Sequence, residues 1–436
     1  MFDNLIGQEE VKALLEGDLR GGSLPPSMLF SGPPASGKLT TALELARVLS
    51  CEGNDRGAWS CPCASCAQHR ALTSPDLLLF GRRSFPEEIP AARETLVRAP
   101  GKAGAFFFVR AVRKLTKRFD PLLWEGEEAK LGKAAPIVAD IEERLALIVP
   151  TPAQEGEREG AAKAASDIVA AARKLEGILP DMPPVAMVRH AEGWARLAPW
   201  GLRKTIIIEN ADAMNESARN ALLKILEEPP RALSFVLLSS RRSALLKTIL
   251  SRVRCYPFAA RDGAASSLVL ERVFRAHEAA TLEGAGPAVL SIERWLESRR
   301  PFPPTRAREI ALALLSAILG ERVALGARHA GPLGALGDTA LAERLDLTAA
   351  FALVRDVTKD LGQKDDDYAT SFSAILEAME GVLGEFLRAE DLAAAELQFM
   401  ARLAGLLREA KTSRETFNLQ AGLLLESLAY RARDLP

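Results

Sequence analysis

The sequence predicts an α/β domain built on a parallel sheet, followed by an all-helical C-terminal region. Three observations support this fold class. A short apolar strand, Met28–Phe30, runs directly into a glycine-rich loop and a helix, an order typical of phosphate-binding α/β units. Three further apolar runs have the composition of strands buried on both faces of a parallel sheet: Leu77–Phe80, Lys204–Ile208 and Phe235–Ser239. Beyond residue 303, several segments place apolar residues at helical spacing.

The composition is that of an ordinary globular protein. The chain has 436 residues, of which 26% are charged and 48% are apolar, and this length suggests about two to four domains. Its formal net charge is −1, so no overall field attracts nucleic acid. No apolar run approaches the ~18 residues of a membrane span, and the N-terminus lacks the features of a signal peptide. We therefore expect a cytoplasmic protein with no membrane partner and with reduced cysteines.

The glycine-rich loop spans Gly32–Lys38, and a helix is expected from about Leu39 to Leu49. Backbone amides and the helix N-terminus would form a cradle for an anion, and Lys38 would add a positive charge. The loop predicts ATP or ADP binding; the alternative is a plain glycine turn before a helix. The hydroxyl that normally follows the lysine and holds Mg²⁺ is replaced by Leu39, and Thr40 lies about 100° further around the helix.

Four of the five cysteines lie within sixteen residues: Cys51, Cys61, Cys63 and Cys66. In a reducing compartment this clustering favours Zn²⁺ over disulfides, and four thiolates can complete a closed tetrahedral site. The spacing is C-x9-C-x-C-x2-C, and His69 follows as a reserve ligand. We predict structural zinc; the alternative is a loop with free thiols. Cys255, which stands alone, is expected in the core.

A further helix is predicted between the last two of these apolar strands. Asn215 is a suitable N-cap, and Pro229-Pro230 should end the helix near Glu228. The apolar residues of the helix recur at helical spacing and should face the sheet; they are Ala218, Ala221, Leu222, Ile225 and Leu226.

Four blocks, in the same order, resemble the clamp-loader subunits of bacterial DNA polymerase III, a family of AAA+ proteins. Asn220–Pro230, Asn-Ala-Leu-Leu-Lys-Ile-Leu-Glu-Glu-Pro-Pro, closely resembles the family signature NALLKTLEEPP. The other blocks are the phosphate loop, the cysteine cluster and Ser251–Val253. The family's cysteine spacing is C-x8-C-x2-C-x2-C, so the second cysteine has moved by one residue here while the overall span is unchanged. The resemblance covers about residues 1–80 and 185–300.

The resemblance implies roles for single residues. Active family members carry an Asp-Glu pair, for Mg²⁺ and for the attacking water, where this chain has Glu209-Asn210. Asn210 cannot take a proton from water at neutral pH; the alternative is that the pair is a working variant. Ser239 and Ser240 stand at the nucleotide-sensing position. The candidate nucleotide-binding residues are Gly32, Pro33, Ser36, Gly37, Lys38, Leu39, Thr40 and Glu209.

Arg252 matches the family's arginine finger, which projects into a neighbouring subunit's site, so it is the candidate catalytic residue, acting in trans. The alternative is an ordinary surface or salt-bridged arginine. A loosely aligned third motif, Gly284–Ser291, places Pro287 where active members have a nucleotide-contacting arginine.

This chain is altered at the catalytic positions of its own nucleotide site but retains the arginine finger. This combination most closely resembles the delta-prime members of the family. The implied function is that of a non-hydrolysing subunit of the clamp loader, a component of the DNA-directed DNA polymerase complex. The implied partners are the gamma/tau and delta subunits, with the sliding clamp and primed DNA as targets, at the nucleoid. One alternative is an active gamma/tau-like ATPase. A more distant one is an unrelated ATP-dependent AAA+ regulator.

The implied organisation has three parts. Residues 1–260 form the AAA+ P-loop parallel-sheet domain, with a zinc module at 51–66 and a helical insertion at about 85–185. Residues 261–302 form a helical lid, and residues 303–436 form an all-helical collar, or oligomerisation, domain. The helices expected in the collar are Arg306–Leu319, Leu347–Leu361, Ser371–Arg388, Leu392–Glu409 and Thr416–Arg431.

The insertion is unlike the family and is expected to be mostly helical. One helix has an apolar stripe formed by Phe108, Val112, Leu115, Phe119 and Leu122. Its opposite face is basic and consists of Arg110, Arg113, Lys114, Lys117 and Arg118. This basic stripe either contacts DNA phosphates or is a solvated face. Two more helices, Ile137–Ile148 and Ala161–Ile178, are expected on either side of a polar, mobile segment at Thr151–Gly160.

Overall fold

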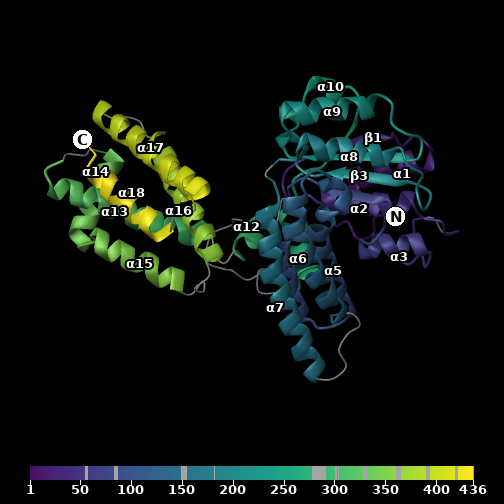
Figure 1. The fold of residues 1–436 in the computed structure, drawn as a ribbon, viewed down its shortest axis with the longest axis horizontal. Helices are drawn as coiled ribbons and strands as arrows, with labels where there is room; N and C mark the ends of the chain where they lie inside the picture. Colours follow the sequence, from purple (N-terminus) through teal and green to yellow (C-terminus); the bar gives the residue numbers. More distant parts are fainter. Residues whose placement is uncertain are drawn as a thin grey trace. The chain divides into compact units, whose positions relative to one another are not determined.

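The computed structural model describes residues 1–54, 57–82, 87–148, 155–180, 182–276, 291–299, 302, 304–327, 331–359, 365–388, 393–417 and 421–435. The chain forms two compact units, Met1–Leu296 and Glu297–Pro436. Figure 1 labels the helices and strands of both. No helix in these ranges is both long and apolar enough to cross a membrane.

The first unit is built on a five-stranded parallel sheet with the order β2-β3-β4-β1-β5 (Figure 1). The strands are β1 Ser27–Ser31, β2 Leu77–Phe80, β3 Lys204–Ile208, β4 Leu233–Ser239 and β5 Arg254–Pro257. The α/β prediction and its four strands are confirmed. The edge strand β5 was not predicted, because two of its four residues are exposed and it lacks the apolar run of a strand buried on both faces.

The two faces of the sheet bury alternate residues of each strand, as pleating requires. Ile206 and Ile208 of β3 pack into the core shared with α8 Val185–Ala195 and α9 Glu216–Glu227. Ile207 faces the other core, shared with α1 Glu9–Arg20 and α2 Lys38–Leu49. The carboxyl ends of β1 and β3 therefore lie near the start of α2, where the phosphate loop is.

The helix that carries the family signature forms as predicted. Asn215 caps α9, since its side-chain oxygen accepts a hydrogen bond from the Ala218 amide at 2.9 Å. The helix ends at Glu227. Its apolar residues Ala218, Leu222, Ile225 and Leu226 are buried and Ala221 is partly buried.

Within the described residues, α8 and four helices that precede it connect β2 to β3: α4 Glu88–Arg98, α5 Lys102–Thr116, α6 Glu128–Ala146 and α7 Glu155–Ile178, with short turns η1 Lys117–Phe119 and η2 Pro121–Trp124. In Figure 1, α5, α6 and α7 extend away from the sheet. The predicted burial of the apolar stripe is confirmed, with Leu122 partly buried and the other four residues buried. The prediction that one helix carries the whole stripe is wrong, because α5 ends at Thr116 and Phe119 and Leu122 lie in η1 and η2. The prediction of a mobile segment at Thr151–Gly160 is wrong for Glu155–Gly160, which belong to α7; residues 151–154 lie outside the described ranges.

The rest of the first unit consists of short elements: α3 Ala64–Ala71, η3 Ala211–Ala213, η4 Arg242–Ala244, α10 Lys247–Leu250, α11 Gly263–Arg272 and α12 Ile292–Glu297. Helices α11 and α12 share a small core, to which Ala91 of α4 contributes. Most of the Gly284–Ser291 motif, Pro287 included, lies outside the described ranges. The division of this unit into a AAA+ domain and a lid stays a prediction.

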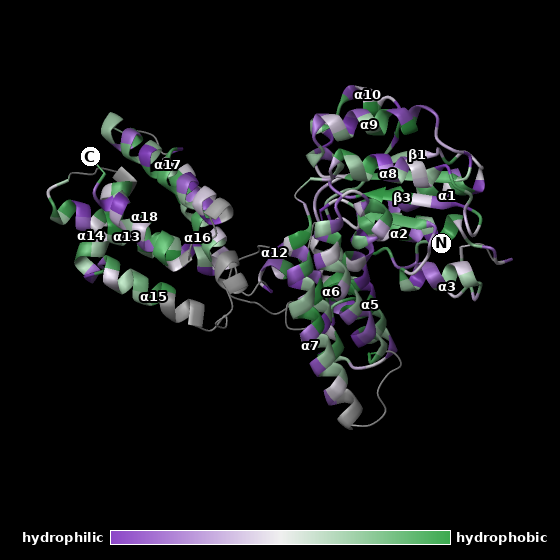
Figure 2. Cartoon of the chain, viewed as in Figure 1, coloured by the Kyte–Doolittle hydropathy of each residue, from purple (hydrophilic) through white to green (hydrophobic). Residues whose placement is uncertain are grey.

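The described part of the second unit is helical, with α13 Pro304–Ala324, α14 Gly331–Glu343, α15 Leu347–Lys359, α16 Asp365–Phe386, α17 Ala394–Phe417 and α18 Ala421–Arg433. Figure 2 shows hydrophobic and hydrophilic residues along each helix, and the apolar ones form one core. Helix α14 was not predicted because its glycines are poor helix formers. They allow close packing against α13 instead: a Cβ on Gly337 would lie 3.3 Å from the Val323 Cγ2.

Candidate nucleotide-type site and four-cysteine module

The phosphate loop joins β1 to α2 and is held in a conformation that needs its glycines. Gly37 caps α2 with a φ of 98°, in the left-handed region that side chains disfavour. A Cβ on Gly32 would lie 2.2 Å from the Phe258 carbonyl oxygen, so only glycine fits beside the end of β5. The backbone geometry of an anion cradle is therefore in place.

Lys38 bends back onto the loop. Its Nζ donates to the carbonyl oxygens of Gly32 at 2.6 Å and Pro33 at 2.5 Å, and lies 3.4 Å from the Ser36 Oγ. Burial lowers the pKa of Lys38 to about 8, against the opposing charges of Glu209 and Asp212. A phosphate entering the loop would replace these carbonyl contacts.

Arg261 lies against the same loop and was not singled out from the sequence. Its guanidinium donates to the carbonyl oxygens of Ile6 and Ala35, and a Cβ on Gly37 would lie 2.7 Å from its Nη2. Burial lowers the pKa of Arg261 to about 10. The loop thus has two cations, Lys38 and Arg261, beside it.

The position that normally holds the Mg²⁺ hydroxyl is apolar. Leu39 packs against the core that α2 shares with the sheet. The next buried hydroxyl, Thr41, donates to the Gly37 carbonyl within its own helix at 3.0 Å. Thr40 is partly buried. Leu39 offers no metal ligand, and the Thr41 hydroxyl is already used inside the helix.

Glu209 follows β3 and forms a buried ion pair with Arg118, which lies just after α5. Arg118 Nη2 donates to Glu209 Oε2, and the exposed side-chain fractions are 1% and 7%. Arg118 Nε also donates to the Gly81 carbonyl at 2.9 Å. Gly81 has to be glycine, since a Cβ there would lie 2.1 Å from the Glu209 carbonyl oxygen. A guanidinium therefore neutralises the one carboxylate at the predicted metal position.

Asn210 and Asp212, which follow Glu209, form hydrogen bonds with other residues. Asn210 has a left-handed φ of 53°, and its Nδ2 donates to the Arg82 carbonyl at 3.2 Å. Asp212 is buried; its oxygens accept from the Ser240 amide at 3.3 Å and the Arg241 Nε at 3.2 Å. The Ser239 hydroxyl accepts from the Arg241 amide. Asp212 therefore ties the end of β3 to the predicted sensor segment after β4.

The structure contradicts both interpretations of the basic stripe. Arg110 donates to the carbonyls of His69 and Arg70, Arg113 to that of Ala71 at 3.0 Å, and Lys117 to that of Ser74 at 3.0 Å. Lys114 pairs with Glu88 at 2.5 Å. The stripe is neither solvated nor open to DNA, because it meets backbone carbonyls at the C-terminal end of α3 and in the turn that follows. Burial accordingly lowers the pKa of Arg110 to about 10.

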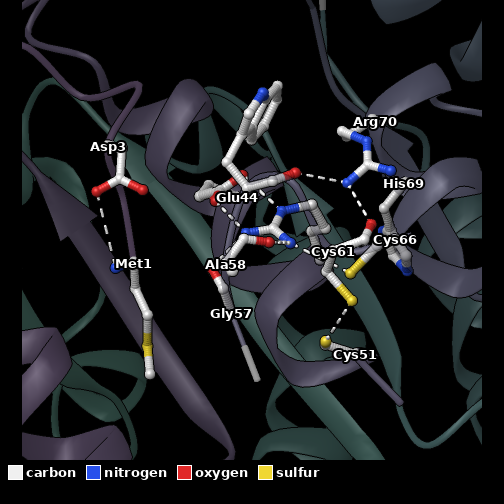
Figure 3. A network of polar contacts seen from close by, with 12 residues as sticks. Met1, Asp3, Glu44, Cys51, Gly57, Ala58, Cys61, Cys66, His69 and Arg70 are labelled. Carbon is white, nitrogen blue, oxygen red and sulfur yellow. Dashed lines mark hydrogen bonds and ion pairs between the residues drawn. The ribbon is translucent and has the colours of Figure 1, made fainter. Parts of the chain in front are cut away.

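The four cysteines come together as predicted. One Sγ from each of Cys51, Cys61, Cys63 and Cys66 lies within 4.8 Å of the others, and Figure 3 shows three of them side by side. Cys63 also caps α3, since its Sγ accepts from the Cys66 amide at 3.4 Å. His69 is buried but does not belong to this group of ligand atoms. Four soft thiolates at this spacing fit a tetrahedral Zn²⁺.

Charged partners hold the cysteine module to α2 (Figure 3). Arg47 forms a fully buried ion pair with Glu44 at 2.6 Å, and it donates to Cys66 Sγ at 3.2 Å and to the Gly57 carbonyl at 2.7 Å. Burial opposes ionisation of Cys63, but the amides of Cys66 and Glu52 lower its pKa to about 6. These contacts place positive charge and amide donors next to sulfurs that would be thiolates when metal is bound.

Arg252 follows α10 on the surface of the first unit. Its Nη2 donates to Glu227 Oε1 at 2.7 Å and its Nη1 to the Thr248 carbonyl at 2.9 Å. The exposed side-chain fractions of Arg252 and Glu227 are 33% and 50%. Within the described residues, none of its hydrogen bonds reaches the phosphate loop or Glu209. Its role as a finger stays a prediction.

Comparison with known proteins agrees with this arrangement. A family model described as "DNA polymerase III, delta subunit" matches residues 7–125 and 185–262. The chain is similar to the DNA polymerase III subunit delta' of Pseudomonas aeruginosa, at 34% identity over 30% of this chain and 32% of that protein. It is also similar to the subunit delta' of Bacillus subtilis, at 45% identity over 13% and 17% of the two chains.

A third relative is the replication factor C small subunit 2 of Pyrobaculum arsenaticum, at 54% identity over 11% of this chain and 15% of that protein. The chain spans about a third or less of the length of each of these relatives. Fold and site together define a P-loop α/β protein with a four-cysteine module. These similarities support the clamp-loader AAA+ family of DNA polymerase III delta-prime subunits as the family of this chain.

The cysteine cluster predicts one tightly bound Zn²⁺ per chain. Structural zinc contributes roughly 10–16 kcal/mol of apparent binding energy in small peptides, so replacing one ligand should release most of the metal. Metal analysis by mass spectrometry of Cys63→Ser should find far less than one zinc per chain. Cys255→Ser, which changes a cysteine outside the cluster, should retain it. Unmodified protein with well under one zinc per chain, prepared without chelators, would contradict the prediction.

The Arg118–Glu209 pair predicts strong coupling in a double-mutant cycle. Removing one partner of a buried ion pair typically costs about 3–5 kcal/mol, so Arg118→Met should be strongly destabilising. Adding Glu209→Gln should restore part of the loss, because the remaining buried charge is then removed. Denaturant unfolding of the full chain measures each variant.

The matched control is Arg196 with Glu192, an exposed pair within one helical turn, where the same Met and Gln replacements should show much weaker coupling. Additive effects of Arg118→Met and Glu209→Gln would mean that the two side chains do not form the buried pair.

Proposed function

We propose that this protein is a non-hydrolysing subunit of the DNA polymerase III clamp loader, which supports loading of the sliding clamp on primed DNA. The observation that carries the proposal is the buried Arg118–Glu209 ion pair beside a phosphate loop without a metal-binding hydroxyl. Phosphoryl transfer depends on metal ions that neutralise charge and on a positioned water. Here the carboxylate is already neutralised, and Asn210 cannot act as a base.

Nucleotide binding without turnover is compatible with the same residues. Gly32, Gly37 and Lys38 keep the backbone cradle and the charge that phosphates need. ATP or ADP would then act as a structural ligand, with Lys38 exchanging its carbonyl contacts for phosphate oxygens. The cysteine module, with Zn²⁺, would stiffen the end of α2 through Arg47.

The partners proposed from the family are the gamma/tau and delta subunits, which would meet this chain through its AAA+ and collar domains. In such an assembly Arg252 would serve a neighbour's nucleotide. Its exposure and its single carboxylate partner, Glu227, support this, because an exposed pair of this kind is worth little and can be exchanged for a phosphate. Among the described residues, Arg252 forms its hydrogen bonds with Thr248, Ser251 and Glu227, and none of these residues belongs to the phosphate loop.

The second candidate is a gamma/tau-like active ATPase. The complete glycine cradle with Lys38 favours it, whereas Leu39 and the Arg118–Glu209 pair disfavour it. An unrelated ATP-dependent AAA+ regulator is a more distant alternative, which does not account for the Asn220–Pro230 signature.

The proposed trans role predicts that Arg252→Ala slows hydrolysis by the adjacent motor subunit. An arginine finger is worth roughly 10³–10⁵ in rate, so a large loss is expected in a reconstituted complex with clamp and primed DNA. Arg252→Lys should rescue poorly, because lysine lacks the planar fork. The measurement is ATP turnover together with clamp loading.

The control is Arg196→Ala, which removes another surface arginine paired with a glutamate and should leave turnover unchanged. Assembly is checked by size-exclusion chromatography. Full turnover by an assembled Arg252→Ala complex would remove the finger from the proposal. A complex that loads clamps equally well without this chain would remove the proposed function itself.

A further inference from the structure

A cavity of about 680 Å³ lies within the first unit, between the turn that joins α4 to α5 and the end of α11. It is separate from the phosphate loop and from the cysteine module, since neither contributes a lining residue. The turn contributes residues 98–104, and α11 with its following turn contributes Arg272, Val273 and Arg275. The volume falls within the roughly 300–1,000 Å³ of small-molecule sites.

The lining of this cavity is strongly basic. It includes Arg98, Lys102, Arg272 and Arg275 and no acidic residue, although the whole chain has a net charge of −1. All four are exposed. Arg98 pairs with Glu94 at 2.9 Å along its own helix. The other three form no ion pair with any described residue. The Glu94 carboxylate offsets Arg98 alone, so the lining keeps an excess of positive charge, which favours a bound anion.

The backbone adds donors to the same cavity. Helix α5 begins at Lys102, and no side chain caps it, because Gly101 occupies the N-cap. The first backbone bond into the helix is donated by Ala105, so the amides of Lys102, Ala103 and Gly104 precede it. A Cβ on Gly104 would lie 2.7 Å from the Ala99 carbonyl, so the turn packs this closely only with glycine.

The lining of the cavity also has an apolar part, which packing and hydrogen bonds stabilise. Phe107 lines it and packs edge-to-face on Phe274, with ring centroids 5.2 Å apart. The Thr95 hydroxyl is buried and lies 2.9 Å from both the Ala91 and the Phe274 carbonyls, which links α4 to the end of α11. The lining of the cavity therefore combines cations and backbone amides with an aromatic side chain.

We propose that this cavity binds a phosphorylated small molecule of nucleotide size, independently of the phosphate loop. Its phosphates would lie against the α5 amides and the four cations, which match the charge and the acceptor oxygens of a phosphate ester. Its apolar part would lie against Phe107 and Val273. No divalent metal is needed, because the lining offers no carboxylate to hold one.

The test is equilibrium binding by calorimetry to the full chain carrying Lys38→Ala, which disables the phosphate loop. The probes are ATP, inorganic tripolyphosphate and a single-stranded 20-nucleotide DNA, each without Mg²⁺. We expect one ATP per chain. Arg272→Gln with Arg275→Gln should weaken ATP binding by about tenfold for each charge-assisted hydrogen bond lost. Circular dichroism confirms that the variant is folded.

The matched control is Arg196→Gln with Arg431→Gln, which removes the same charge from two exposed ion-paired arginines elsewhere and should leave ATP binding unchanged. ATP or tripolyphosphate binding that depends on Arg272 and Arg275 supports the proposal. It is overturned if neither binds, if the control pair weakens binding equally, or if only the DNA strand binds through these arginines. None of these outcomes depends on the proposed clamp-loader function.

Discussion

The arrangement of the first unit depends on the buried ion pair between Arg118 and Glu209. It links the helices between β2 and β3 to the carboxyl end of the central strand, where a P-loop protein would place its metal. A buried charge pair is maintained only when each partner is well satisfied; Arg118 meets this condition by also donating to the Gly81 carbonyl and to Lys114. The same residue thus joins these helices to the sheet and neutralises the Glu209 carboxylate.

The basic face of α5 contacts the cysteine module in a similar way, through cations that donate to backbone carbonyls. Arg110 and Arg113 donate to carbonyls at the end of α3, and Lys117 donates to the Ser74 carbonyl just after it. Helix α3 carries Cys66. On the other side, Arg47 connects α2 to Cys66 and to the Gly57 carbonyl. The module is therefore held between α2, which starts at the phosphate loop, and α5, which leads to Arg118. Hydrogen bonds thus connect the cysteine cluster to the two helices that lead to the phosphate loop and to Arg118.

The sequence predicted those features of the fold and the site that depend on a local pattern of residues. The four apolar strands, the Asn215 cap and the four-cysteine cluster each depend on residues near one another in the chain. Arg118 could not be assigned to Glu209, because no spacing relates residues 91 positions apart. The basic stripe was misinterpreted for the same reason: helical periodicity shows which residues share a face, but not that this face meets the end of another helix. The edge strand β5 and the glycine-rich α14 lacked the apolar pattern on which recognition depends.

The central claim is that this chain does not hydrolyse ATP itself, and steady-state turnover of Mg²⁺-ATP by the purified full chain tests it most directly. Lys38→Ala provides the baseline, because it removes the lysine charge of the phosphate loop and leaves Arg118, Glu209 and the cysteines unchanged. The account predicts that the unmodified chain and Lys38→Ala show the same background rate, with and without clamp and primed DNA. Turnover on the order of 1 per second that is lost in Lys38→Ala would contradict it.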